Sequence, residues 1–187
     1  MKVILVLIGL VSIVTSTIYT IDSDTSIGIT LDKDNRRLYF NHTMLAGHFI
    51  GLGVQNSEDD ADIYGIQVTM EDEVTTAMKI FDVYITEGNE VHSYTKQAYK
   101  GIKLRQALPR VSLEYYRPLK LNRKGRNQTL EFDKDYRMTY VFEEQNIEDR
   151  GFSNRGYFTM RLDSNTGLVY INNSLKGESG EFIKTSA

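Results

Sequence analysis

The chain has 187 residues, a formal net charge of −3 and no cysteine. This length favours one domain whose core is large enough to fold without a second. The lack of cysteine excludes disulfides, thiol nucleophiles, iron–sulfur ligation and Cys-containing zinc sites, and the interspersed charges provide no basic tract for nucleic acid or anionic membranes.

The first residues have the pattern of a secretory leader. Lys2 follows the initiating methionine, and a nearly unbroken apolar run extends from Val3 to Val14. This run is shorter than the about 20 residues of a membrane helix. Val14 and Ser16 occupy the minus-three and minus-one positions of a cleavage site before Thr17. The alternative is an uncleaved anchor or a buried N-terminal strand.

We therefore predict a signal peptide over residues 1–16, a folded domain over residues 17–175 and a polar C-terminal tail over residues 176–187. After the leader, no apolar run reaches the length of a membrane span. The predicted location is extracellular, or the lumen of the secretory pathway.

The elements that follow the leader are predicted to be short strands, because Tyr, Val, Ile and Thr recur in runs bounded by Gly, Asn and Asp. The first three form a meander with a turn at residues 32–35. Residues 90–110 are predicted to be a long loop with one short strand at most. In chain order the predicted strands span residues 19–21, 27–31, 37–40, 49–54, 63–69, 78–85, 111–116, 138–142, 157–162 and 168–171.

Nine or ten short strands with turn signals at regular spacing, and no lasting helical periodicity, predict an all-β fold. The expected architecture is an immunoglobulin-like sandwich of two antiparallel sheets. Three sequons agree with secretion, and they predict glycosylation at Asn41, Asn127 and Asn172.

Four segments occur in an order that carries further information. They are Phe49-Ile50-Gly51-Leu52-Gly53-Val54, Ala61-Asp62-Ile63-Tyr64-Gly65, Phe81-Asp82-Val83-Tyr84 and the segment Glu114 to Leu119. They resemble the W-x-G-x-G-F, A-D-V-x-x-G, D-x-Y and F-x-R-P-L motifs of the DOMON family, a secreted β-sandwich also found as the cytochrome domain of cellobiose dehydrogenase. Phe49 stands where the family usually has tryptophan. The resemblance extends from about Tyr19 to Leu162 and implies a DOMON-type sandwich.

One branch of that family binds heme b through a methionine and a histidine. The resemblance puts Glu58 at the place of the methionine and the segment Phe152 to Gly156 at that of the histidine, so neither ligand is present. His48 and His92 remain as alternative iron ligands. We expect all three histidines to be ordinary surface residues, with His42, inside a sequon, exposed to solvent. No cofactor and no firm metal site are predicted, and heme b stays as an alternative.

The resemblance also implies recognition of a carbohydrate or another small ligand, on a face of the sandwich or in its end loops. Such a site needs carboxylates or amides to hold hydroxyl groups and a ring to stack on the sugar. The candidate residues are Asp62, Tyr64, Asp82, Tyr84, Asn56 and Tyr94, each of which has packing or turn capping as its alternative role. The acidic run over residues 58–62 does not match an EF-hand loop and is expected to be solvated.

No nucleophile elbow, phosphate loop, dinucleotide fingerprint or zincin motif occurs, so no enzyme activity is predicted. The favoured hypothesis is a secreted, non-catalytic module that binds a glycan or other small ligand. The alternatives are a heme b electron carrier and a structural or adhesive subunit that docks on an extracellular or membrane protein.

Overall fold

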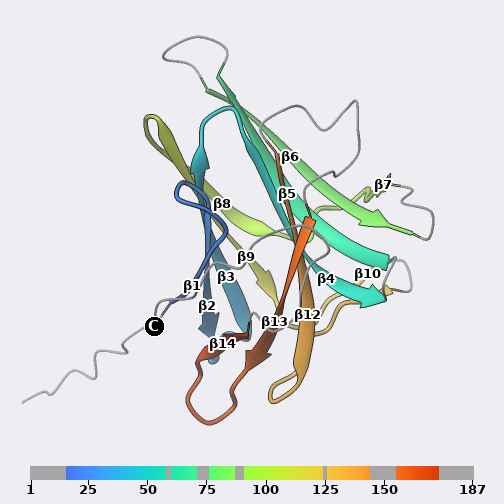
Figure 1. Cartoon of the computed structure of the whole chain (residues 1–187). Helices are drawn as coiled ribbons and strands as arrows, with labels where there is room; N and C mark the ends of the chain where they lie inside the picture. Colours follow the sequence, from blue (N-terminus) through green and yellow to red (C-terminus); the bar gives the residue numbers. More distant parts are fainter. Residues whose placement is uncertain are drawn as a thin grey trace, which may run out of the picture.

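The computed structural model describes residues 16–57, 60–70, 76–86, 91–123, 126–143 and 155–172 (Figure 1). All regular elements within these ranges are β-strands. In chain order the strands are β1 (Thr17–Thr20), β2 (Ser26–Asp32), β3 (Arg37–Leu45), β4 (Phe49–Ser57), β5 (Asp60–Met70), β6 (Thr76–Ile85), β7 (Val91–Ser93), β8 (Lys100–Ala107), β9 (Arg110–Pro118), β10 (Asn122–Arg123), β11 (Arg126–Asn127), β12 (Asp135–Glu143), β13 (Arg155–Leu162) and β14 (Val169–Asn172).

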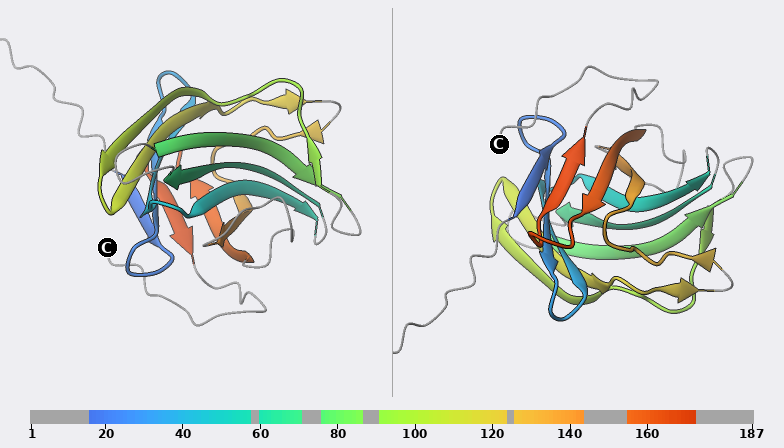
Figure 2. Two further views of the ribbon diagram at one scale, coloured as in Figure 1. Left: turned by 90° about the horizontal axis from the view of Figure 1, so that it is seen from above. Right: turned by 90° about the horizontal axis from the view of Figure 1, so that it is seen from below.

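Two antiparallel sheets pack as a sandwich, which confirms the predicted all-β fold class. One sheet has five strands in the order β1-β2-β3-β9-β8, and the other has seven in the order β14-β13-β12-β4-β5-β6-β7. Strands β10 and β11 pair separately as a small hairpin. Figure 2 shows the layers from above and below. Across the described ranges, no helix is long and apolar enough to cross a membrane.

The core between the sheets follows from strand alternation. On β3 the residues Leu38, Phe40 and Met44 are buried while their neighbours point outward. They join Ile50 and Leu52 of β4 in one apolar cluster that draws on both sheets. Because successive side chains on a strand point to opposite faces, this pattern fixes which face of each sheet is internal.

The glycine-rich segment of β4 serves a close approach between strands. Phe49 belongs to a second apolar cluster, together with Ile63 and Val141, on the opposite face of the seven-stranded sheet. Gly53 points to this same face, and a Cβ placed on it would lie 1.9 Å from the backbone oxygen of Asp62. Only glycine fits there, since the clash would be with backbone that has no freedom to move aside.

We expect Gly53→Ala to lower the free energy of unfolding by roughly 1–3 kcal/mol, as an overpacked site does. Gly28→Ala is the matched control, because its added Cβ would come no closer than 3.3 Å, to the Oγ of Ser16. Urea unfolding of both variants measures the difference. Equal stability of the two variants would show that Gly53 is not required by the pairing of β4 with β5.

Two predictions about the chain between residues 90 and 126 were wrong or incomplete. The predicted long loop contains β7 and the eight-residue strand β8. Strand β8 is an edge strand in which only Ile102 and Leu104 are partly buried, so its apolar alternation is short and weak. Its pairing with β9 is also interrupted by a register shift between Lys100 and Lys103. The β10–β11 hairpin was not predicted, because two-residue strands carry no periodic signal.

The prediction that His42 is solvated is wrong. On β3 the flanking Asn41 and Thr43 point outward, and His42 is buried with 0% of its surface exposed. Its Nε2 lies 2.9 Å from the hydroxyl of Tyr115, while its Nδ1 has no hydrogen-bond partner in the described structure. Burial lowers the pKa of His42 to about 3, so the imidazole is neutral.

Several predicted features lie outside the described residues. These are leader residues 1–15, the tail over residues 176–187, the loops at residues 71–73 and 87–89, Glu58 and residues 152–154.

Candidate functional site

Five of the six predicted ligand residues lie close together near one end of the seven-stranded sheet, and four of them are on the paired strands β5 and β6. Asp62 on β5 pairs with Tyr84 on β6, and Tyr64 pairs with Asp82. Directly paired residues of adjacent strands share a face, so these four side chains point to one side. That side faces the five-stranded sheet, because Tyr64 belongs to the core between the layers.

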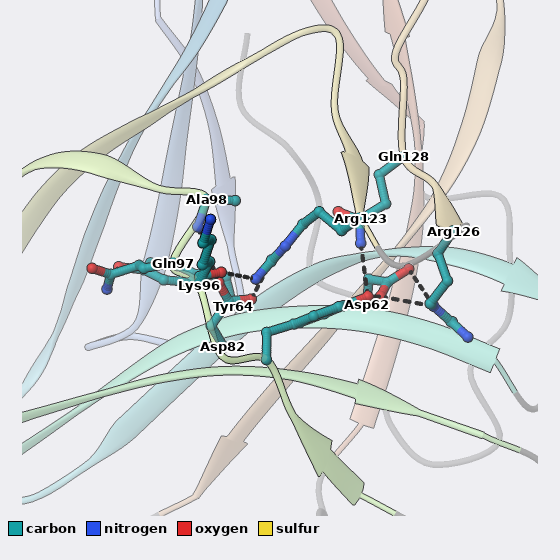
Figure 3. Close-up of polar contacts among 10 residues, drawn as sticks. Asp62, Tyr64, Asp82, Lys96, Gln97, Ala98, Arg123, Arg126 and Gln128 are labelled. Atoms are coloured by element: carbon teal, nitrogen blue, oxygen red, sulfur yellow. Dashed lines mark hydrogen bonds and ion pairs between the residues drawn. The ribbon is translucent and has the colours of Figure 1, made fainter.

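The β10–β11 hairpin supplies two arginines to these aspartates (Figure 3). The Nη1 of Arg123 donates to Asp82 at 2.7 Å, and the Nε of Arg126 donates to both carboxylate oxygens of Asp62 at 3.1 and 3.3 Å. Asp62 and Asp82 expose only 4% and 9% of their side chains. Buried carboxylates require such partners, since an unpaired charge in the interior is strongly unfavourable.

Tyr94, which follows β7, lies at the centre of this cluster. Its hydroxyl donates to Asp62 and accepts a 3.3 Å hydrogen bond from the amide of Gln128. The guanidinium carbon of Arg123 lies 3.6 Å from the centroid of its ring. Burial, reinforced by the hydrogen bond to Asp62, raises the pKa of the Tyr94 hydroxyl well above its usual range. The hydroxyl therefore remains a donor at any physiological pH.

The segment after Tyr94 is anchored to the same charges. The backbone N–H of Ala98 donates to Asp82 at 3.2 Å, and Arg123 donates to the backbone oxygen of Lys96. Asp82 is thus held by one guanidinium and one peptide N–H. The residues after Tyr94, which belong to the predicted long loop, are therefore fixed by hydrogen bonds to the buried side chains of Asp82 and Arg123.

Tyr64 forms the internal floor of the cluster. It is completely buried, its ring stacks on Tyr99 at 3.7 Å, and its hydroxyl accepts a 3.0 Å hydrogen bond from Gln97. Burial, with smaller effects of Tyr99 and Asp82, raises the pKa of Tyr64 above its usual range. In this arrangement Tyr64 contacts protein on all sides.

The partly exposed part of the cluster consists of aromatic rings and one guanidinium. Tyr84, His92 and Tyr94 are each half-buried. The rings of Tyr84 and His92 stack with centroids 5.0 Å apart, and Tyr94 meets Tyr84 at 4.9 Å. The guanidinium carbon of Arg126, whose side chain is 19% exposed, lies 4.9 Å from the centroid of the Tyr84 ring. We call Tyr84, His92, Tyr94 and Arg126 the aromatic rim.

The sixth candidate residue, Asn56, lies on β4 where the pairing with β5 shifts register between Gln55 and Ser57. The placement of its side chain is outside the described structure. Among the sequons, Asn41 and Asn172 are exposed on β3 and β14, and Asn127 belongs to β11.

The sequence reasoning missed Arg123, Arg126 and Gln128. They lie in a short hairpin with no apolar periodicity, so no pattern marks them. One signal was present. Asp62 and Asp82 occur in strands at positions that share a face with core residues, and inward carboxylates require cationic or N–H partners from elsewhere in the chain.

The two histidines considered as iron ligands are far apart. Val54, Asp62, Tyr84 and His92 form one row across strands β4 to β7. His48 precedes β4, about 20 Å from that row at the rise of an extended strand. Two axial ligands must reach one iron from opposite sides, so His48 and His92 do not form such a pair. Among the described residues, no group of three or more His, Asp or Glu side chains is arranged to hold a metal.

Neither a protein-family model nor a curated protein matches this chain. The likeness to the DOMON family therefore depends on the four motifs in the sequence. In the structure those motifs fall on β4, β5, β6 and β9, three of which are adjacent strands of one sheet. The second and third motifs contain the aspartates of the cluster described above.

Proposed function

We propose that the chain is a secreted, DOMON-type, non-catalytic module that binds a glycan or a similar polyhydroxylated ligand at the aromatic rim. The observation that carries the proposal is the side-by-side placement of half-buried rings and a guanidinium–carboxylate pair, with Tyr84 beside His92 and Arg126 bound to Asp62. Sugars present apolar ring faces for stacking and hydroxyl groups for planar polar partners, and the rim offers both chemistries.

The charge balance of the cluster favours a neutral ligand. The pairs Asp62–Arg126 and Asp82–Arg123 each combine one carboxylate with one guanidinium, so together they carry no net charge. A ligand with a full charge would have to disturb one of these pairs. Hydroxyl groups can instead share the donors and acceptors at the edges of the ion pairs, which suits a neutral sugar better than an acidic one.

The rim is also organised before any ligand arrives. Tyr94 is held by Asp62, Gln128 and Arg123, and the segment behind it is held by Asp82. Fixed side chains lose little conformational entropy on binding, which raises affinity for a small ligand.

A glycan array probed with the secreted protein tests this proposal. We expect binding to a subset of neutral glycans, and Tyr84→Ala should weaken it by about tenfold or more, the effect of losing about 1.4 kcal/mol of stacking. Tyr170→Ala is the matched control, because Tyr170 is a 49% exposed tyrosine on β14, a strand that takes no part in the rim. Melting temperatures of both variants verify that they fold.

Two results would overturn the proposal. One is the absence of binding to every glycan by a protein that is secreted and folded. The other is equal loss of binding in Tyr84→Ala and Tyr170→Ala, which would place the ligand elsewhere.

A further inference from the structure

The outer face of the five-stranded sheet carries a pair of tyrosines, one exposed and one half-buried. Tyr39 on β3 is 37% exposed and lies directly opposite Tyr116 on β9. The ring centroids are 5.3 Å apart, and the guanidinium carbon of Arg37 lies 4.9 Å from the Tyr116 ring. The two rings add apolar surface to the middle of this sheet, and a group that covered them would remove that surface from water.

The ring of Tyr116 packs flat against the sheet because the residue beneath it is a glycine. Gly101 of β8 has a φ of +64°, and a Cβ placed on it would lie 2.6 Å from the Cε1 of Tyr116. The ring therefore lies over the backbone of the neighbouring strand, in space that any other residue at position 101 would fill. Tyr39 and Tyr116 together make a low platform, which we call the tyrosine platform.

The sequon residue Asn41 is beside the tyrosine platform on the same face. It follows Tyr39 by two residues on β3, so the two side chains point the same way about 7 Å apart. Its cross-strand neighbours are Glu114 and Gly28. Gly28 has no side chain. A Cβ placed on it would have the Oγ of Ser16 as its nearest neighbour, at 3.3 Å, and Ser16 is the last residue of the predicted leader.

We propose that Asn41 carries an N-linked glycan whose first N-acetylglucosamine lies on the tyrosine platform and covers it. In the transfer step the Nδ2 of Asn41 bonds to the anomeric carbon of a lipid-diphosphate-linked oligosaccharide. The bond from that carbon to the diphosphate oxygen breaks, the lipid diphosphate leaves with the electron pair, and Nδ2 loses one proton. The Thr43 hydroxyl that completes the sequon is on the same face of β3.

The position of Asn41 explains why this sequon, rather than Asn172, would have a structural effect. Asn172 is at the end of the edge strand β14, whereas Asn41 is in the middle of a nine-residue inner strand. On this face the nearest aromatic neighbours of Asn41 are Tyr39, two residues away on β3, and Tyr116, diagonally across on β9. Ring–sugar packing of this kind stabilises the folded state because it removes apolar surface from water.

This inference rests on the secretory route of the proposed function, though not on ligand binding. The test is expression of the full chain in a eukaryotic secretory host, followed by intact mass and thermal unfolding of wild type, N41Q, Y39S and the N41Q/Y39S double variant. N172Q is the matched control. We expect Asn41 to be occupied, and N41Q to lower Tm by roughly 2–4 °C, with a much smaller change when Tyr39 is already serine.

The outcomes separate the two proposals. A secreted protein with Asn41 unmodified, or an equal Tm loss for N41Q in both Tyr39 backgrounds, overturns the glycan inference alone. A chain that is retained in the cytosol without any glycan overturns this inference together with the secretory route. A loss of glycan binding at the aromatic rim bears only on the proposed function.

Discussion

Replacing Asp62 with alanine is expected to lower the free energy of unfolding by about 3–5 kcal/mol, the usual cost of removing one member of a buried ion pair. The substitution removes the acceptor of the Arg126 Nε and of the Tyr94 hydroxyl. It also removes a side chain that is 96% enclosed, its exposed fraction being 4%. Chemical unfolding monitored by tyrosine fluorescence measures the change.

The control for this prediction is Asp24→Ala. Asp24 also pairs with an arginine, Arg110, at 2.6 Å, but this pair is exposed to solvent, and exposed pairs contribute little to stability. Asp62→Asn keeps the size of the side chain and separates the loss of charge from the loss of volume. If Asp62→Ala were no more destabilising than Asp24→Ala, the ionic cluster would not hold this end of the sandwich together.

The second large effect is an acid-dependent loss of stability caused by His42. The unfolded histidine has a pKa near 6.5, whereas burial lowers the pKa in the folded protein to about 3. Below pH 6.5 the unfolded chain therefore binds a proton that the folded protein does not. The free energy of unfolding consequently decreases as the pH is lowered. The slope approaches about 1.4 kcal/mol per pH unit well below pH 6.5, and the loss between pH 6.5 and pH 4.5 is about 2 kcal/mol.

His42→Gln should remove this slope, because an amide can keep a hydrogen bond to Tyr115 but does not titrate. The window above about pH 4.5 avoids most of the titration of carboxylates such as Asp32 and Asp163, whose pKa values are lowered by hydrogen bonds. His48→Gln is the matched control. Unfolding free energies measured over this window decide the matter, and an unchanged slope in His42→Gln would contradict a neutral, buried imidazole.

The strands with alternating or continuous apolar residues could be predicted from the sequence. The segments around Phe40, Leu52 and Ile63 became β3, β4 and β5 near the predicted positions, because burial of one or both faces leaves a periodic trace in the sequence. Longer strands than predicted were found at most ends, where pairing continues beyond the apolar run. The sandwich class followed from the number and spacing of these strands.

The features that were not predictable depend on contacts between distant segments. Arg123 and Arg126 are more than 40 residues from Asp82 and 60 from Asp62 in the chain, and no local pattern links them. His42 was misplaced because a polar residue in a sequon was expected at the surface, whereas strand alternation puts the residue after an outward Asn41 inside. Alternation was the more reliable guide there.

Strand alternation also made part of the candidate site predictable. Asp62 with Tyr64 and Asp82 with Tyr84 each repeat at a spacing of two on neighbouring strands, which places all four on one face once the strands pair. The sequence does not show which of the four stays accessible. Tyr64 is fully buried while Tyr84 is half-buried, because Tyr99 and Gln97 from a distant segment cover only the former.

The most direct test of the account is an NMR titration of the ¹⁵N-labelled mature protein with the neutral glycan that binds best on the array. We expect chemical-shift changes concentrated on the residues of the aromatic rim, Tyr84, His92, Tyr94 and Arg126. Changes concentrated at the other end of the sandwich near His48, or saturable binding that leaves the rim signals unmoved, would contradict the claim that this rim is the ligand site.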